Sequence, residues 1–219
     1  MEKHEENTKV YLKEIREKFY ELRSFEISNL WQRSIFLSAL LVLFFSGYGY
    51  LVSKLLEETN FSSNKVLIIN EICCGVALLA IVFSIIWIMM AKGSKAWFEV
   101  YERRILKIEE EKELGISDDY KMESKCSPWS LDSNLLTNNA GAYSVSKLNI
   151  IIGRFLMIMW LIIFLIHYIA SFILIINNDD EINYITNGVV LTLLLIFLLY
   201  IIITARNNRW AKSGSLTPP

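Results

Sequence analysis

The sequence predicts an all-α integral membrane protein that crosses the bilayer four times, and two observations carry this prediction. The first is that four windows of at least 20 residues contain no Asp, Glu, Lys or Arg: Ser34–Ser53, Ile72–Ala91, Phe155–Asn178 and Ile182–Ala205. A helix needs about 20 residues to cross about 30 Å of hydrocarbon. The second is that Lys and Arg gather in alternate segments between these windows. The average composition of the 219 residues, 53% hydrophobic and 21% charged with a net charge of −1, hides this segregation.

The basic residues also predict the orientation. The N-terminal segment, the long central segment and the C-terminal tail together hold 20 Lys and Arg, and the two remaining connections hold 2. Cytoplasmic segments of membrane proteins carry the excess of basic residues. We therefore expect both termini and the central segment to lie in the cytoplasm.

In chain order we expect nine segments. They are a cytoplasmic amphipathic helix (1–33), a first span (34–53), a short extracytoplasmic link (54–71), a second span (72–91), a cytoplasmic helix with a polar linker (92–154), a third span (155–176), an acidic extracytoplasmic turn (177–185), a fourth span (186–205) and a cytoplasmic tail (206–219).

Both cytoplasmic helices carry a narrow apolar stripe at helical spacing. The first consists of Leu12, Ile15, Phe19 and Leu22, and the second of Trp97, Tyr101, Ile105 and Ile108. A stripe this narrow does not fold alone, so the two helices either pack on each other or on copies from neighbouring subunits, or they lie along the lipid surface. Between about 116 and 145 the periodicity disappears, which is typical of a linker.

Small residues predict where the spans pack, because helices in a bilayer associate through close contact. The second span has a seam with a 3.5-residue period, and the first span has a shorter one. The seam residues are Cys73, Ala77, Ala80, Ser84, Trp87 and Ala91 in the second span, and Ser46, Gly49 and Ser53 in the first. The fourth span is apolar on all sides, which favours a peripheral place against lipid.

A few ionisable groups lie in or beside the spans, where such groups are costly and often functional. His167 lies near the middle of the third span, where it either bonds across helices or senses protons. Glu71, at the outer end of the second span, is either solvated at the membrane interface or lines the outer mouth of a pore. Asp179, Asp180 and Glu181 are solvated turn residues or, repeated in a ring, a negative rim that attracts cations.

Neither a catalytic nor a metal site is predicted. Cys73, Cys74 and Cys126 lack the spacing of zinc ligands. Gly93-Ser94-Lys95 lacks the earlier glycine of a phosphate loop and follows an apolar helix instead of a strand. We therefore expect no enzyme activity and no cofactor, and membrane lipid and other copies of the chain as partners, with neither nucleotide nor nucleic acid.

Three polar boundary motifs carry a family resemblance. They are YELRSFEISNLWQRS from Tyr20 to Ser34, AKGSKAW from Ala91 to Trp97 with Tyr101, Glu102 and Ile105 after it, and YSVSKLNI from Tyr143 to Ile150. Over about residues 10–176 the chain resembles the RipA family of octameric bacterial inner-membrane proteins. The resemblance implies a multi-pass homo-octamer in the bacterial cytoplasmic membrane, with no catalytic residue to carry over.

The boundary motifs place polar groups at helical spacing close to the inner membrane face. The interface set consists of Arg23, Glu26, Asn29 and Arg33 on one helix, and Lys92, Lys95, Trp97, Glu99, Tyr101 and Glu102 on the other. These side chains either fix the register of neighbouring subunits or face headgroups and water. The predicted function is a non-enzymatic oligomeric membrane protein with a scaffold or envelope-maintenance role; the alternative is an ion channel with an axial, cation-favouring pore.

Overall fold

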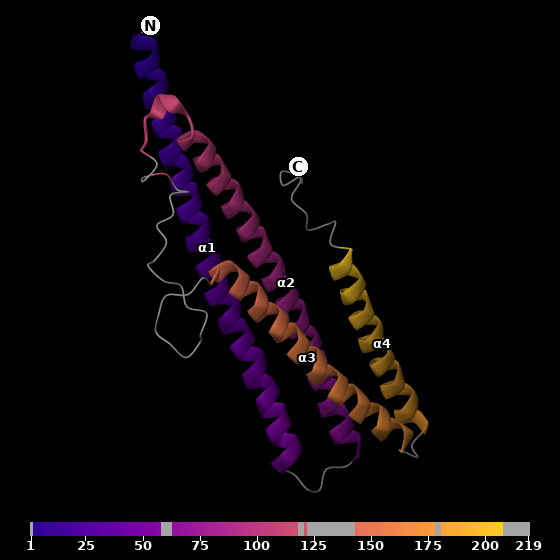
Figure 1. Cartoon of the computed structure of the whole chain (residues 1–219). Helices are drawn as coiled ribbons and strands as arrows, with labels where there is room; N and C mark the ends of the chain where they lie inside the picture. Colours follow the sequence, from indigo (N-terminus) through magenta and orange to yellow (C-terminus); the bar gives the residue numbers. More distant parts are fainter. Residues whose placement is uncertain (1, 58–62, 118–120, 122–142, 178–180, 208–219) are drawn as a thin grey trace. The chain divides into compact units, whose positions relative to one another are not determined.

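The computed structural model describes residues 2–57, 63–117, 121, 143–177 and 181–207. These residues form four α-helices and one short 3-10 helix (Figure 1): α1 (Glu2–Glu57), α2 (Ser63–Glu109), η1 (Lys112–Leu114), α3 (Val145–Ile176) and α4 (Glu181–Arg206). Each α-helix contains a stretch long and apolar enough to cross a membrane. The predicted all-α class and the four apolar helices are therefore confirmed for the described part of the chain, and the orientation across the membrane stays a prediction.

The helices are longer than the predicted spans. The helix α1 joins the predicted segments 1–33 and 34–53 without interruption and continues to Glu57, while α2 begins at Ser63 and continues past the second span to Glu109. The reason is that no breaker interrupts them, since the three prolines of the chain are at 128, 218 and 219. The helix α2 is followed by η1, which Gly115 caps at φ 60° in the left-handed conformation that favours glycine.

The described residues divide into two compact units, which we treat separately. Unit 1 consists of Met1–Arg33 and Met90–Ile150, and unit 2 of Ser34–Met89 and Ile151–Pro219. In unit 1 the buried apolar residues include Leu30, Ile105 and Ile150. Unit 1 therefore contains most of the charged residues of α1 and α2, and unit 2 contains most of the two uncharged windows of these helices.

In unit 2, the helix α3 packs closely on α2 at Gly153. A Cβ atom built at Gly153 would lie 2.8 Å from Cγ1 of Ile88 and 3.1 Å from Cδ1 of Trp87. Any side chain at this position would hold the two helices apart, so the contact depends on glycine.

The helix α4 joins unit 2 through a narrow contact. Leu191 of α4 forms a buried cluster with Leu67 of α2 and Ile175 of α3. Further along α4 only Leu198 and Ile201 are buried, and most of its other large apolar side chains are exposed. Most of its surface is therefore available to lipid or to another chain.

Candidate functional site

The most buried ionic contact of unit 1 joins Arg16 of α1 to Glu109 at the end of α2. Nε and Nη2 of Arg16 both lie 2.7 Å from Oε1 of Glu109, and the Tyr20 hydroxyl donates a hydrogen bond of 3.0 Å to the same oxygen. The Glu109 side chain is 1% exposed and the Arg16 side chain 24%. A carboxylate this deeply buried is stable only with charged or polar donors around it. The contact therefore fixes the register of α1 against α2.

Tyr20 serves this contact as a neutral donor. Burial and the hydrogen bond to the Glu109 carboxylate raise the pKa of the Tyr20 hydroxyl above its usual 10.0. The Arg16 guanidinium lies 5.0 Å from the centroid of the Tyr20 ring, within the range of a cation–π contact. Tyr20 therefore packs beneath the arginine while its hydroxyl proton points to the carboxylate.

Two turns further along α1, Arg23 contacts Glu102 of α2. Nη2 of Arg23 lies 3.1 Å from Oε1 of Glu102, and its guanidinium covers the Phe98 ring at 4.7 Å. Both residues belong to the predicted interface set, and this ion pair forms within one chain. The reason is that α1 and α2 pack against each other in unit 1, so the partner of Arg23 is available in its own chain.

The other predicted interface residues mostly bond locally. Arg33 donates to the buried Ser94 hydroxyl over 3.3 Å and lies 3.6 Å from Glu26. Lys95 pairs with Glu99 of the same helix. The rings of Trp97 and Tyr101 stack with centroids 5.9 Å apart, Asn29 is half-buried, and Lys92 is exposed.

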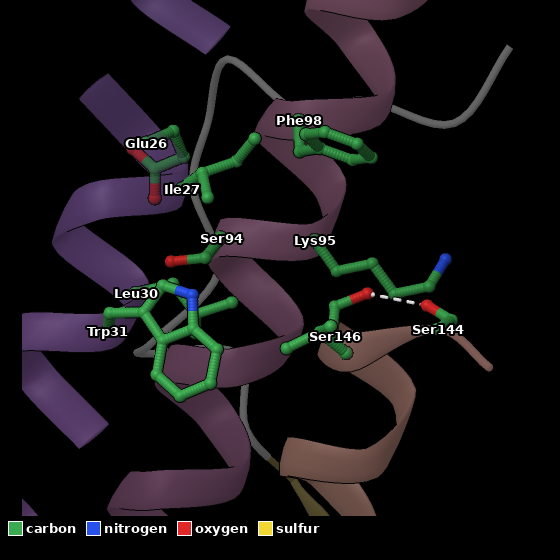
Figure 2. A pocket seen from close by; sticks show the side chains of 10 residues that line it. Glu26, Ile27, Leu30, Trp31, Ser94, Lys95, Phe98, Ser144 and Ser146 are labelled. Atoms are coloured by element: carbon green, nitrogen blue, oxygen red, sulfur yellow. Dashed lines mark hydrogen bonds between the residues drawn. The ribbon is translucent and has the colours of Figure 1, made fainter. Parts of the chain in front are cut away.

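A cavity of about 290 Å³ opens in unit 1 beside these contacts. Figure 2 shows Ile27, Leu30 and Trp31 of α1 on one side and, on the other, Ser146 of α3 and Ser144 just before this helix, with side chains of α2 between them. Its lining residues are Glu26, Ile27, Leu30, Trp31, Ser94, Lys95, Phe98, Ser144, Val145 and Ser146. The hydroxyl oxygens of Ser144 and Ser146 lie 3.1 Å apart. The lining contains neither His nor Cys, so the cavity can hold an apolar group but lacks a nucleophile–base pair of the usual kind.

Unit 2 contains a buried hydrogen-bonded chain centred on His167. Nδ1 of His167 lies 2.7 Å from Oδ1 of Asn70, and Nε2 lies 3.1 Å from the Tyr48 hydroxyl. Because an amide oxygen only accepts, Nδ1 carries the proton and Nε2 accepts from Tyr48. Asn70 in turn donates to the carbonyl oxygen of Val66 over 2.8 Å. Both ring nitrogens of His167 are therefore satisfied by a neutral imidazole, which links α1, α2 and α3.

The predicted seam of α2 lies inside the subunit. Its six residues, Cys73, Ala77, Ala80, Ser84, Trp87 and Ala91, are 0–5% exposed. The Cys74 thiol beside the seam lies 3.7 Å from the Phe164 carbonyl oxygen of α3. Side chains buried by their own chain leave no surface for a second copy at this seam. Ser46 and Gly49 of the shorter seam are exposed and Ser53 is half-buried.

The predicted acidic positions differ in what the structure describes. Glu71 is half-buried, and its Oε1 atom is buried without a hydrogen-bond partner among the described residues. Asp179 and Asp180 lie outside the described residues, as does the side chain of Glu181, the first residue of α4. Across the described part of the chain, no three His, Cys, Asp or Glu side chains are close enough to hold a metal ion.

Sequence reasoning missed Arg16, Glu109, Tyr48 and Gly153. Arg16 and Glu109 follow directly after Ile15 and Ile108 of the predicted stripes, and a charged residue at the edge of a buried face indicates a partner across it. For Tyr48 and Gly153, no pattern in one sequence identifies the neighbour that each contacts.

These features define a helical integral membrane protein whose buried polar groups bond mainly to other parts of the same chain. The chain belongs to the octameric membrane protein family (8xMP), which matches residues 13–170. This confirms the predicted family of octameric membrane proteins and its homo-oligomeric character, while the narrower RipA assignment stays a prediction. The match ends within α3, before α4. No curated protein and no solved structure matches the chain.

Proposed function

We propose that the protein is a structural subunit of a homo-octamer in the bacterial inner membrane, with a scaffold or envelope-maintenance role and no catalytic activity. The observation that carries the proposal is the use of the polar side chains in both units. Arg16, Glu109 and Tyr20 bond to one another in unit 1, and Tyr48, His167 and Asn70 do so in unit 2. Side chains that bond to one another in this way stabilise helix packing, and their polar groups do not face a substrate.

The test is the mass and the conductance of the same sample. The full chain, purified in nanodiscs, is expected to give a native mass of eight copies, and the same oligomer in a planar bilayer is expected to give no current above that of lipid alone. Cells lacking the chain are expected to lose resistance to detergent or osmotic shock and to regain it on complementation. A monomer in nanodiscs contradicts the oligomer, and reproducible currents contradict the scaffold.

The second candidate function is a cation channel on the axis of the oligomer, and Glu71 is the observation that favours it. Its buried carboxylate oxygen without a partner is a group that a cation could neutralise. If the oligomer conducts, Glu71→Gln is expected to reduce the cation current. The matched control is Glu57→Gln, at an exposed carboxylate that already bonds to Lys54. Equal currents in both variants exclude Glu71 from the pathway.

A further inference from the structure

The charged part of α1 carries a stripe that is apolar except for Lys18 and is exposed except for the half-buried Ile15. Tyr11, Ile15, Lys18, Leu22 and Phe25 follow one another at steps of four, three, four and three residues, the spacing of a helix seam. Phe25 is 63% exposed, Tyr11 62% and Leu22 36%. At 3.6 residues per turn, the stripe lies roughly 140° around the helix from the side that contacts α2. The described residues of this chain therefore give the stripe little cover.

A shallow groove lies on the outer side of α2. Val100, Arg103, Arg104 and Lys107 line a hollow of about 210 Å³, and the three cations are exposed. By the same helical geometry the groove faces roughly opposite to Glu102 and Glu109, the residues that contact α1. The stripe and the groove are thus on different outer faces of unit 1.

The ion pairs of unit 1 show that the stripe of α1 and the groove of α2 lie at the same height along the helix axes. From Arg16 to Arg23 the chain advances seven residues, and from their partners Glu109 to Glu102 it goes back seven. Two residues further, Phe25 is level with Val100. By the same register, Glu21 is level with Arg104.

We propose that the stripe of one subunit docks in the groove of the neighbouring subunit, Phe25 seated at Val100. The inference rests on the proposed homo-oligomer and names its contact surface. A cyclic ring needs two different, complementary faces on every subunit, and rotation about an axis along the helices preserves their level. The Phe25 ring then meets the guanidinium groups of the groove, a favourable cation–π arrangement.

Charge supports a second copy as the occupant. The outer side of α1 carries exposed Glu17 and Glu21 beside the stripe, opposite in sign to the groove. Lys18 lies within the stripe, where its ammonium bonds to Glu21 at 2.8 Å, so its stem can cover apolar surface. Lipid headgroups fit less well, because Arg103 lies twelve residues beyond the uncharged window that ends at Ala91. That is about 18 Å of helix, roughly two Debye lengths at physiological salt.

Disulfide crosslinking of the full-length oligomer tests the contact. The chain carries Phe25→Cys and Val100→Cys together, with Cys126→Ser, while the buried Cys73 and Cys74 are retained. Oxidation in native membranes is expected to give a ladder of covalent multimers on a denaturing gel, because each subunit links to the next. The matched control replaces Phe25→Cys with Ser24→Cys, an exposed position one residue away on another face, and is expected to give no ladder.

The outcomes separate the contact from the oligomer itself. A ladder from Phe25→Cys with Val100→Cys but not from the control supports the contact. An intact native mass with no ladder overturns the contact and leaves the homo-oligomer standing. Protection of Val100→Cys from maleimide only in nanodiscs with anionic lipid assigns the groove to lipid and also overturns it. A wild-type monomer removes the proposed function and the contact together.

Discussion

Replacing Arg16 with alanine is expected to be among the most destabilising single charge removals in unit 1. The change leaves the Glu109 carboxylate, 1% exposed, with two of its donors lost and Tyr20 still bonded at 3.0 Å. Breaking a buried ion pair from one side costs about 3–5 kcal/mol. In a chain of this size, 1 kcal/mol corresponds to about 2–4 °C in Tm. We therefore expect Tm to fall by about 6–20 °C, measured by circular dichroism of the full chain in detergent.

Two comparisons test the reasoning. Lys18→Ala removes a pair whose side chains are 71% and 67% exposed, and is expected to change Tm little because solvent screens such a pair. The double variant Arg16→Met with Glu109→Met removes both charges, so it is expected to recover most of the loss. If Arg16→Ala lowers Tm no more than Lys18→Ala does, or if the double variant is as unstable as the single one, the buried ion pair does not fix the register.

Three further predictions concern single contacts, each measured as Tm of the oligomer. Gly153→Ala is expected to be about 1–3 kcal/mol less stable than the control Gly75→Ala, because its Cβ meets two side chains and that of Gly75 meets none; equal values refute the close contact. His167→Leu is expected to cost about 1 kcal/mol of stability, and Ser46→Ala, at an exposed position, almost none. Similar losses in the two variants would contradict a stabilising role of the hydrogen bonds from His167 to Tyr48 and Asn70. Tyr20→Phe is expected to cost about 1 kcal/mol below pH 10. Because the pKa of Tyr20 is raised in the folded state, the stability difference between the wild type and Tyr20→Phe should shrink as pH rises beyond 10. A difference that stays constant contradicts the hydrogen bond from the Tyr20 hydroxyl.

The sequence predicts the class of the fold well, because the signal for membrane helices is long and does not depend on neighbours. Charge-free windows alone predict four apolar helices, and boundary motifs near Trp31 and Ser94 predict the family. The helix ends are predicted less well, since α1 continues to Glu57 through residues that a window of uncharged positions excludes. Length and charge define a span, whereas a helix ends only where its backbone meets a breaker or a cap.

The sequence identifies candidate packing residues but not their partners, for one physical reason. A small-residue seam such as that of α2 indicates a packing surface, but a pattern on one helix does not say whether the partner belongs to the same chain. The same holds for Arg23 and Glu102, because a single sequence does not show that these two residues contact each other. For His167, the partners Tyr48 and Asn70 lie on two other helices and far away in the sequence, so the sequence alone does not identify them.

The burial of the seam bears on how copies assemble. Because Ala77 and Ala80 of α2 are fully covered by their own chain, contacts between subunits must form on faces that the chain leaves open. Within the uncharged windows an open apolar face suits lipid as well as protein, so exposure there does not distinguish the two. On the charged part of α1 the same exposure is unfavourable in water, and Phe25 therefore indicates a protein partner more clearly than any residue of α4 does.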